Sequence, residues 1–206
     1  MEVKSRHHLR SDEITAIREA VADHLGADID GDTFESVEFV DADYELVLVD
    51  GDPAVFYVDD EPFLTVRGAN DFDPETGVVT VDAGAISFVS DGADVMRPGI
   101  VEADPEICEA DLVVVAEETH GKALAVGRAR VDGDEMIGDG GKVVESIHHV
   151  GDDLYGPRVS PRGSRPRRGR PKGARRTRPT RLGRCEVLCG AGRDSKGQSR
   201  GGRRRR

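Results

Sequence analysis

The chain has 206 residues, and its charged side chains are divided between two unlike parts. Residues 1–155 carry 38 acidic and 10 basic side chains, a net charge of −28, whereas residues 156–206 carry two acidic and 19 basic ones, a net charge of +17. A first part this acidic cannot attract nucleic acid through its overall charge. No stretch is apolar over the length that spans a bilayer, and the N-terminus lacks the apolar segment of a signal peptide. We therefore expect a cytoplasmic protein without a membrane partner.

The carboxylate excess of residues 1–155 is typical of a halophilic protein. Repulsion among carboxylates destabilises a compact chain in dilute buffer, but at about 1 M salt the screening length falls to about 3 Å. Only Lys4, Lys122 and Lys142 supply lysine in this part, which fits an acid-rich, lysine-poor surface. We expect a salt-loaded archaeal cytoplasm, and an ordinary acidic protein is the alternative.

The first predicted elements are one helix and four strands. Ser11 is expected to cap the helix, Asp12 and Glu13 suit the positive end of its dipole, and Gly26 ends it. Its buried face consists of apolar residues at helical spacing, namely Ile14, Ile17, Val21 and Leu25. The strands are predicted at residues 37–41, 44–49, 54–58 and 62–67.

This pattern predicts an α+β domain over residues 1–67 and a linker over residues 68–77, which are rich in turn-forming residues. Basic residues precede the helix, among them Lys4, Arg6 and Arg10. They either contact phosphate or pair with neighbouring carboxylates.

A second domain is predicted over residues 78–155. A β-branched run at residues 78–85 is followed by a helical turn at residues 86–90. Three further strands are predicted at residues 110–117, 123–130 and 143–150. Several strands with one short helix fit a small mixed barrel.

The loop Gly92-Ala93-Asp94-Val95-Met96-Arg97-Pro98-Gly99-Ile100 is the strongest candidate for a binding site. Glycine lets the backbone approach another chain closely, and proline stiffens the loop. We expect an RNA backbone to lie here, bound by loop N–H groups and by Arg97 as a forked phosphate ligand. The alternatives are a merely structural loop and a salt bridge from Arg97 to Asp94 or Glu102.

No catalytic or metal-binding constellation is present in the sequence. Residues 139–142 (DGGK) lack the first glycine and the Ser or Thr of a phosphate-binding P-loop. The acidic turn at residues 28–32 lacks calcium-loop spacing, and Cys185 and Cys189 have no second ligand pair for zinc. We expect no metal, no cofactor and no enzymatic activity.

The composition changes at Gly156, after which arginine, proline and glycine dominate without apolar periodicity. Such a segment is predicted to be disordered, and it could act as a basic arm that wraps nucleic acid. The alternative is a frameshifted product of GC-rich DNA, because the acidic signature ends at the same point. An unbroken codon third-position bias through Gly156 would rule the frameshift out.

Four motifs follow one another in the order found in PUA domains: DAGA at 82–85, GADVMRPGI at 92–100, GKALAVG at 121–127 and HHVGDDLY at 148–155. With KSRHHL at 4–9, residues 1–155 resemble the small archaeal PUA proteins related to the eukaryotic malignant-T-cell-amplified-sequence translation factors. The resemblance implies a pre-PUA domain followed by a PUA barrel that binds structured RNA, either tRNA or rRNA. The predicted RNA-binding residues are Gly84, Ala85, Gly92, Ala93, Asp94, Val95, Met96, Arg97, Pro98, Gly99, Lys122 and Arg128.

The resemblance leaves the biological setting open. The eukaryotic relatives work with density-regulated protein on the small ribosomal subunit, so the N-terminal domain could instead be a protein-docking module. A third reading is an RNA-binding subunit of a tRNA-modifying enzyme of the archaeosine transglycosylase or pseudouridine synthase type.

Overall fold

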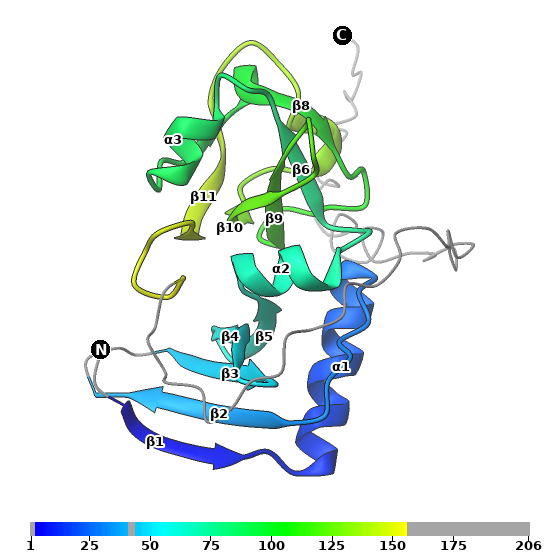
Figure 1. The fold of residues 1–206 in the computed structure, drawn as a ribbon. Coiled ribbons are helices and arrows are strands. Elements are labelled where there is room, and N and C mark those ends of the chain that lie inside the picture. The colour runs from blue at the N-terminus through cyan, green and yellow to red at the C-terminus, as the bar shows by residue number, and fades with distance from the viewer. Residues whose placement is uncertain (1–2, 41–43, 156–206) are drawn as a thin grey trace, which may run out of the picture. The chain divides into compact units, whose positions relative to one another are not determined.

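The computed structural model describes residues 3–40 and 44–155, which build two β-sheets with helices packed against them (Figure 1). Five strands in the order β1-β2-β3-β4-β5 form an antiparallel N-terminal sheet. Six strands in the order β7-β11-β10-β9-β6-β8 form a mixed sheet from the residues that follow. The predicted α+β class is confirmed. The predicted tail over residues 156–206 lies outside the described residues.

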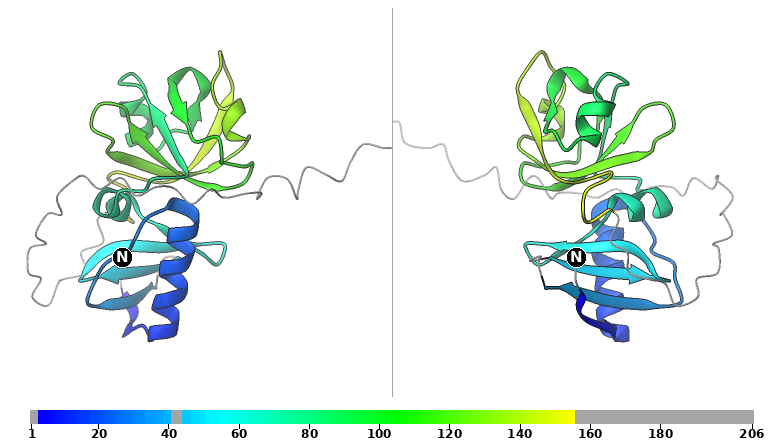
Figure 2. Two further views of the ribbon diagram at one scale, coloured as in Figure 1. Left: turned by 90° about the vertical axis from the view of Figure 1, so that its right-hand side faces the viewer. Right: turned by 60° about the vertical axis from the view of Figure 1, so that its left-hand side comes forward.

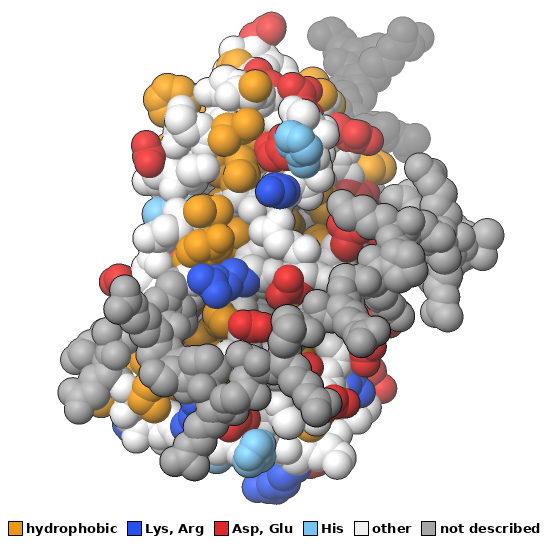
Figure 3. All heavy atoms as spheres, viewed as in Figure 1, with side chains coloured by type: hydrophobic (Ala, Val, Ile, Leu, Met, Phe, Trp, Pro, Cys, Tyr) orange, Lys and Arg blue, Asp and Glu red, His pale blue; other side chains and the backbone are white. Residues whose placement is uncertain are grey.

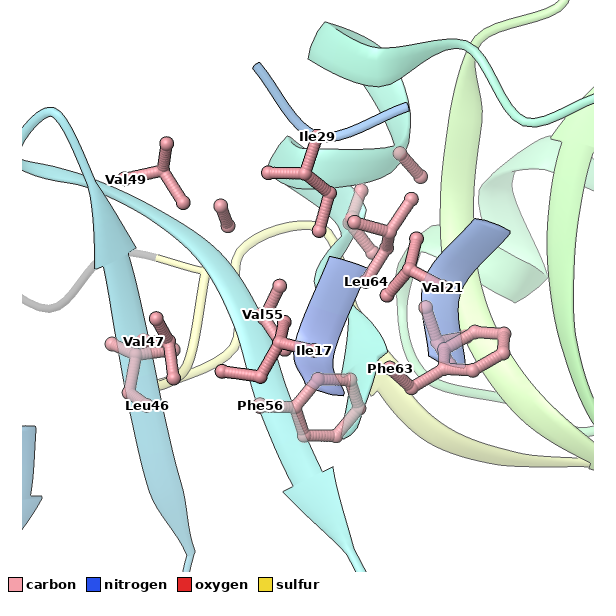
Figure 4. Packing of buried hydrophobic residues seen from close by; sticks show 14 of the residues in the cluster. Ile17, Val21, Ile29, Leu46, Val47, Val49, Val55, Phe56, Phe63 and Leu64 are labelled. Atoms are coloured by element: carbon pink, nitrogen blue, oxygen red, sulfur yellow. The ribbon is translucent and has the colours of Figure 1, made fainter. Parts of the chain in front are cut away.

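The N-terminal elements follow from the apolar spacing of the sequence. They are β1 (Val3–His8), α1 (Ser11–Leu25), β2 (Phe34–Phe39), β3 (Glu45–Val49), β4 (Asp52–Val58), β5 (Glu61–Leu64) and α2 (Val66–Phe72). Helix α1 buries Ile17, Val21 and Leu25, and Figure 4 shows Ile17 and Val21 directed toward Phe56 and Phe63 of the sheet. Burial of such side chains contributes about 1.5–3 kcal/mol each to folding.

The start of the chain differs from the prediction in two respects. Arg10, not Ser11, is the cap residue of α1, and its N–H donates to Glu13 Oε2 at 2.7 Å. Nothing in the sequence predicts β1, because it pairs only with β2 and its side chains are exposed on both faces, so no apolar alternation marks it. Lys4 pairs with Glu38 at 3.0 Å and Arg6 with Glu35 at 2.5 Å, so these cations neutralise neighbouring carboxylates.

The strand predicted at residues 62–67 is β5. It ends at Leu64, earlier than predicted, because Thr65 is the N-cap residue of helix α2. The Thr65 hydroxyl donates to Pro53 O at 2.8 Å and accepts the N–H of Gly68 at 3.0 Å, which caps α2. The predicted linker over residues 68–77 therefore contains most of α2. Its turn-forming residues are tolerated because the helix is short and Asn70 hydrogen-bonds Ala123, with N–O distances of 3.0 and 3.1 Å.

The second domain forms a strongly curled, barrel-like sheet, which Figure 2 shows curling around its interior. Its elements are β6 (Val78–Val81), α3 (Ile86–Ser90), β7 (Val95–Met96), the 3-10 turn η1 (Arg97–Gly99), β8 (Ile100–Ala103), β9 (Leu112–Glu117), β10 (Ala123–Ala129), η2 (Gly133–Glu135) and β11 (Lys142–His149). The predicted helical turn and the three later strands are confirmed. Strands β7 and β8 are too short to leave a period in the sequence.

The closure depends on a connection of three residues. Strands β7 and β8 are the two edges of the mixed sheet, yet only η1 (Arg97–Gly99) separates them in the sequence. Because so short a segment spans from one edge to the other, the sheet must curl until its two edges lie close together. Strand β6 completes the mixed topology by pairing in parallel with β9 and antiparallel with β8.

Strand β9 is buried along its whole length because both of its faces are covered. Val113 and Val115 belong to the core inside the barrel, whereas Leu112 and Val114 belong to the cluster that also contains the N-terminal core. The side chains of a strand alternate between its faces, so the continuous apolar run of this strand supports two cores at once.

The HHVGDDLY motif is organised around one carboxylate. Asp152 Oδ2 lies 2.7 Å from His148 Nδ1 and accepts the N–H of His149 at 3.0 Å, while Oδ1 accepts the N–H of Tyr155 at 2.7 Å. His148 is buried and packs edge-on against Phe56 of the N-terminal sheet, with ring centroids 5.6 Å apart. Asp152 thus fixes a segment that contacts both domains.

We predict that Gly68→Ala destabilises the protein by about 1–3 kcal/mol, because a Cβ there would lie 2.1 Å from Ala54 O and push α2 off β4. The measurement is the urea midpoint at constant salt. Gly140→Ala is the matched control, since a Cβ at Gly140 meets nothing within 4 Å. Equal midpoints for the two variants would contradict close packing of α2 on β4.

A second prediction concerns acid. Burial raises the pKa of Asp152, but the hydrogen bonds from His148, His149 and Tyr155 outweigh it and lower this pKa overall. A carboxylate whose pKa is lowered by folding contributes its full stability at pH values above its unfolded-state pKa of about 3.9. That contribution is lost as the pH falls through the folded-state pKa.

Asp152→Asn should therefore lower stability at pH 7 and flatten the loss of stability between about pH 5 and pH 3. The measurement is the urea midpoint across that range, with the exposed neighbour variant Asp153→Asn as control. If the urea midpoint of Asp152→Asn falls with decreasing pH as steeply as that of the unsubstituted protein, Asp152 is not the group whose lowered pKa stabilises the fold.

Candidate nucleic-acid interface

The predicted binding surface is a corner of the second domain, made of the turn at residues 82–85 and the loop at residues 91–99, with α3 between them; we call it the corner. The N–H of Asp82 donates to Gly99 O at 2.9 Å, and its Oδ1 accepts the N–H of Ala85 at 2.9 Å. A Cβ on Gly99 would lie 2.9 Å from the Ala85 Cβ, so a larger residue would force the segments apart. The turn and the loop, both predicted from the sequence, are thus held together.

Gly92 is required by conformation and by space. Its φ is +85°, a left-handed value that side chains disfavour, and a Cβ would lie 2.6 Å from His149 Nε2. The His149 ring is oriented through Nδ1, which lies 3.1 Å from Val150 O. The loop therefore rests against the imidazole of β11.

Arg97 holds a neighbouring loop in place. Its Nε donates to Glu135 O at 2.8 Å and its Nη1 donates to Gly140 O at 2.9 Å. Within residues 3–40 and 44–155 it forms no ion pair with Asp94 or Glu102, the two partners considered from the sequence. Two of the five guanidinium N–H groups are thus used internally, and the forked phosphate role stays a prediction.

Asp94 instead pairs with a residue outside the predicted set. Its Oδ2 forms an ion pair with Lys142 Nζ, and its Oδ1 accepts the N–H of Ser146 at 2.8 Å. These two hydrogen bonds hold the pKa of Asp94 below its ordinary value. Lys142 is the first residue of β11 and lies opposite Met96 of β7. In the sequence, Lys142 belongs only to the DGGK segment that does not match a P-loop, and nothing there predicts that it reaches the corner.

Several backbone donors expected to bind phosphate are already hydrogen-bonded within the protein. The bonds run from Gly92 N to Val89 O at 3.1 Å, from Ala93 N to Phe88 O at 2.9 Å and from Arg97 N to Gly141 O at 3.0 Å. Internal bonds to these N–H groups give the corner a fixed shape, but they leave fewer donors for a ligand than the sequence suggests.

Neither of the other two predicted cations forms an ion pair with the corner among the described residues. Arg128 Nη2 lies 2.6 Å from Asp59 Oδ2, in the turn between β4 and β5, so it links the two domains. Lys122 lies in the connection between β9 and β10, where its carbonyl accepts the N–H of Glu117 at 3.0 Å. Sequence spacing could not separate these residues from Lys142, because only the strand order decides which strand ends beside β7.

The corner is open at its surface. Exposed positions include Gly84, Ala93 and Pro98, and the side chains of Phe88 and Met96 are 67% and 48% exposed. Val95 points inward and is buried in the barrel core. Figure 3 shows hydrophobic side chains exposed on one face of the molecule, with Lys and Arg scattered among them. The corner therefore offers small and apolar groups to a ligand.

Two negative findings apply to the described part of the chain. None of its helices is long and apolar enough to cross a membrane. Within residues 3–40 and 44–155, no group of three or more His, Cys, Asp or Glu side chains is arranged to hold a metal ion.

Comparison with known proteins gives consistent matches. The PUA domain family model matches residues 77–150. An uncharacterized protein of Methanocaldococcus jannaschii is 44% identical over 114 residues, which cover 55% of this chain and 70% of that protein. Translation machinery-associated protein 20 of Saccharomyces cerevisiae is 33% identical over 118 residues, which cover 54% of this chain and 65% of that protein.

A solved structure extends the likeness over both domains. The conserved PUA domain protein of Thermoplasma acidophilum is 32% identical, with a TM-score of 0.65 over 73% of this chain and 97% of that one. Its coverage shows that the N-terminal sheet and the barrel occur together in that protein as well. This chain belongs to the family of PUA-domain proteins that carry an N-terminal α+β domain, and it is related to the malignant T-cell-amplified sequence proteins and to translation machinery-associated protein 20.

Proposed function

We propose that this protein binds structured RNA, tRNA or rRNA, at the corner of its PUA barrel and acts in translation, in association with the ribosome. The observation that carries the proposal is the open corner, whose backbone is fixed by internal hydrogen bonds while small and apolar groups face outward. The names of the translation-associated relatives support the biological setting.

Recognition at this corner depends on shape more than on charge. The net charge of −28 over residues 1–155 opposes phosphate at long range. A rigid surface of small residues lets an RNA backbone approach closely, and contacts to 2′-hydroxyls would distinguish RNA from DNA. We expect no catalytic activity, because the described residues form the two small domains, and the relatives compared above have names that denote no enzyme.

The first test introduces a carboxylate on the corner. Ala93→Glu should weaken the binding of a labelled tRNA transcript at least about tenfold, because the exposed side chain would face phosphate. Ala22→Glu is the matched control, since Ala22 is an exposed alanine on α1. Fluorescence anisotropy with the full chain compares the two, and the basic segment at residues 156–206 is common to both. Equal affinities of the two variants would exclude the corner as the RNA-binding surface. In a separate pull-down, partner proteins that stay bound after nuclease treatment would favour the protein-docking alternative.

The second test changes the shape of the corner without changing its charge. Gly92→Ala should destabilise the protein by about 1–2 kcal/mol from the left-handed backbone alone, with a further loss from the contact with His149. Gly151→Ala, at a φ of +88° with nothing within 4 Å of its Cβ, has the backbone strain only. The Gly92 variant should therefore have the lower urea midpoint and the weaker tRNA binding. If the two variants behave alike, the loop does not rest on His149.

A further inference from the structure

We infer that Lys142 is the cation that contacts RNA phosphate at the corner, and that Asp94 holds its ammonium group in place until phosphate takes over. This inference rests on the proposed function, because it names the residue by which that site binds a phosphodiester. It assigns a role to an ion pair that no motif in the sequence points to.

The position of Lys142 is the first argument. The residue lies opposite Met96 across the β7–β11 pair, and its Nζ pairs with Asp94 inside the loop at residues 91–99. Its side chain is 48% exposed, so the ammonium group reaches solvent at the edge of the corner. Asp94, 26% exposed, is fixed from the other side by the N–H of Ser146. The strand pairing therefore places a cation beside the corner's exposed small residues.

The contacts of the other cations are the second argument. Of the nine other Lys and Arg side chains in the described residues, seven have partners outside the corner or hydrogen-bond to backbone carbonyls, whereas Arg10 and Lys122 form no ion pair there. Lys4, Arg6, Arg128 and Arg130 pair with Glu38, Glu35, Asp59 and Glu145, Arg18 and Arg67 lie over the rings of Phe34 and Tyr155, and Arg97 bonds two backbone carbonyls. Lys142 is the side chain whose partner belongs to the corner itself.

The energies of the two states allow an exchange. A Lys–carboxylate pair that solvent reaches is weakened by the screening of water, so phosphate can replace Asp94 as the partner of Lys142 at little cost. Asp94 would remain bonded to Ser146 and would repel the incoming phosphate. The carboxylate thus keeps the lysine oriented in the unbound protein and limits the affinity for weakly fitting anions.

Two substitutions should act in opposite directions. Lys142→Gln should weaken tRNA binding about tenfold and reduce the slope of log affinity against log salt concentration by about 0.7–1, as expected for one lost phosphate contact. Asp94→Asn should tighten binding about two- to fivefold, because the amide oxygen still accepts from Ser146 while the competing charge is gone. Lys4→Gln, at a surface Lys–Glu pair on β1, is the matched control and should leave both quantities unchanged.

The decisive readout is the acetylation rate of each lysine in the full chain, measured by mass spectrometry with and without a tRNA transcript. We expect tRNA to protect Lys142 at least about fivefold and Lys4 not at all, since one ammonium is covered by phosphate and the other faces solvent. In Asp94→Asn without RNA, Lys142 should react faster than in the unsubstituted protein.

The outcomes separate the two proposals. If tRNA does not bind, or protects only lysines in residues 156–206, both the proposed function and this inference fail. If Ala93→Glu weakens binding while Lys142 stays unprotected and Lys142→Gln binds normally, RNA uses the corner and the assignment of Lys142 is overturned.

Discussion

The closure of the barrel by three residues is the constraint on which the rest of the second domain depends. Arg97–Gly99 joins the two edge strands of the mixed sheet, so its backbone has to serve both edges at once. On one side it is held by the bond from Arg97 N to Gly141 O, just before β11, and on the other by the bond from Asp82 N to Gly99 O, just after β6. A segment fixed at both ends cannot relax independently. The corner therefore has a defined shape in the absence of any ligand.

Because of this constraint, several groups whose chemistry suits ligand binding form hydrogen bonds within the protein instead. Arg97 looks like a phosphate ligand in the sequence, yet two of its N–H groups hold the carbonyls of residues 135 and 140. The loop N–H groups look like anion donors, yet three of them close internal bonds. The barrel-like sheet satisfies its own backbone groups internally, because an unpaired polar group in or near a packed core is costly. The surface left over is shaped by glycine, alanine and proline.

Charge has a local role in this acidic protein. Among the described residues, five of the ten Lys and Arg side chains pair with a carboxylate on a neighbouring strand, turn or loop, which lowers repulsion without creating a basic patch. The ion pair between Arg128 and Asp59 also links the two domains, as do the contact of His148 with Phe56 and the shared core beneath β9. Recognition of an anion by such a protein therefore needs a single well-placed cation and a fitted surface, since the overall field is unfavourable.

Apolar periodicity and glycine-framed turns act over a few residues, so the residues alone sufficed to predict the fold class, helix α1, the main strands and the turns that frame the corner. The sequence could not identify β1, β7 and β8, since short or exposed strands carry no period of their own and exist only through their partners. The predicted binding residues included Lys122 and Arg128, which stay predictions, and did not include Lys142. Which cation reaches the corner is decided by the strand order β7-β11-β10, a long-range pairing that the spacing of residues along the chain does not contain.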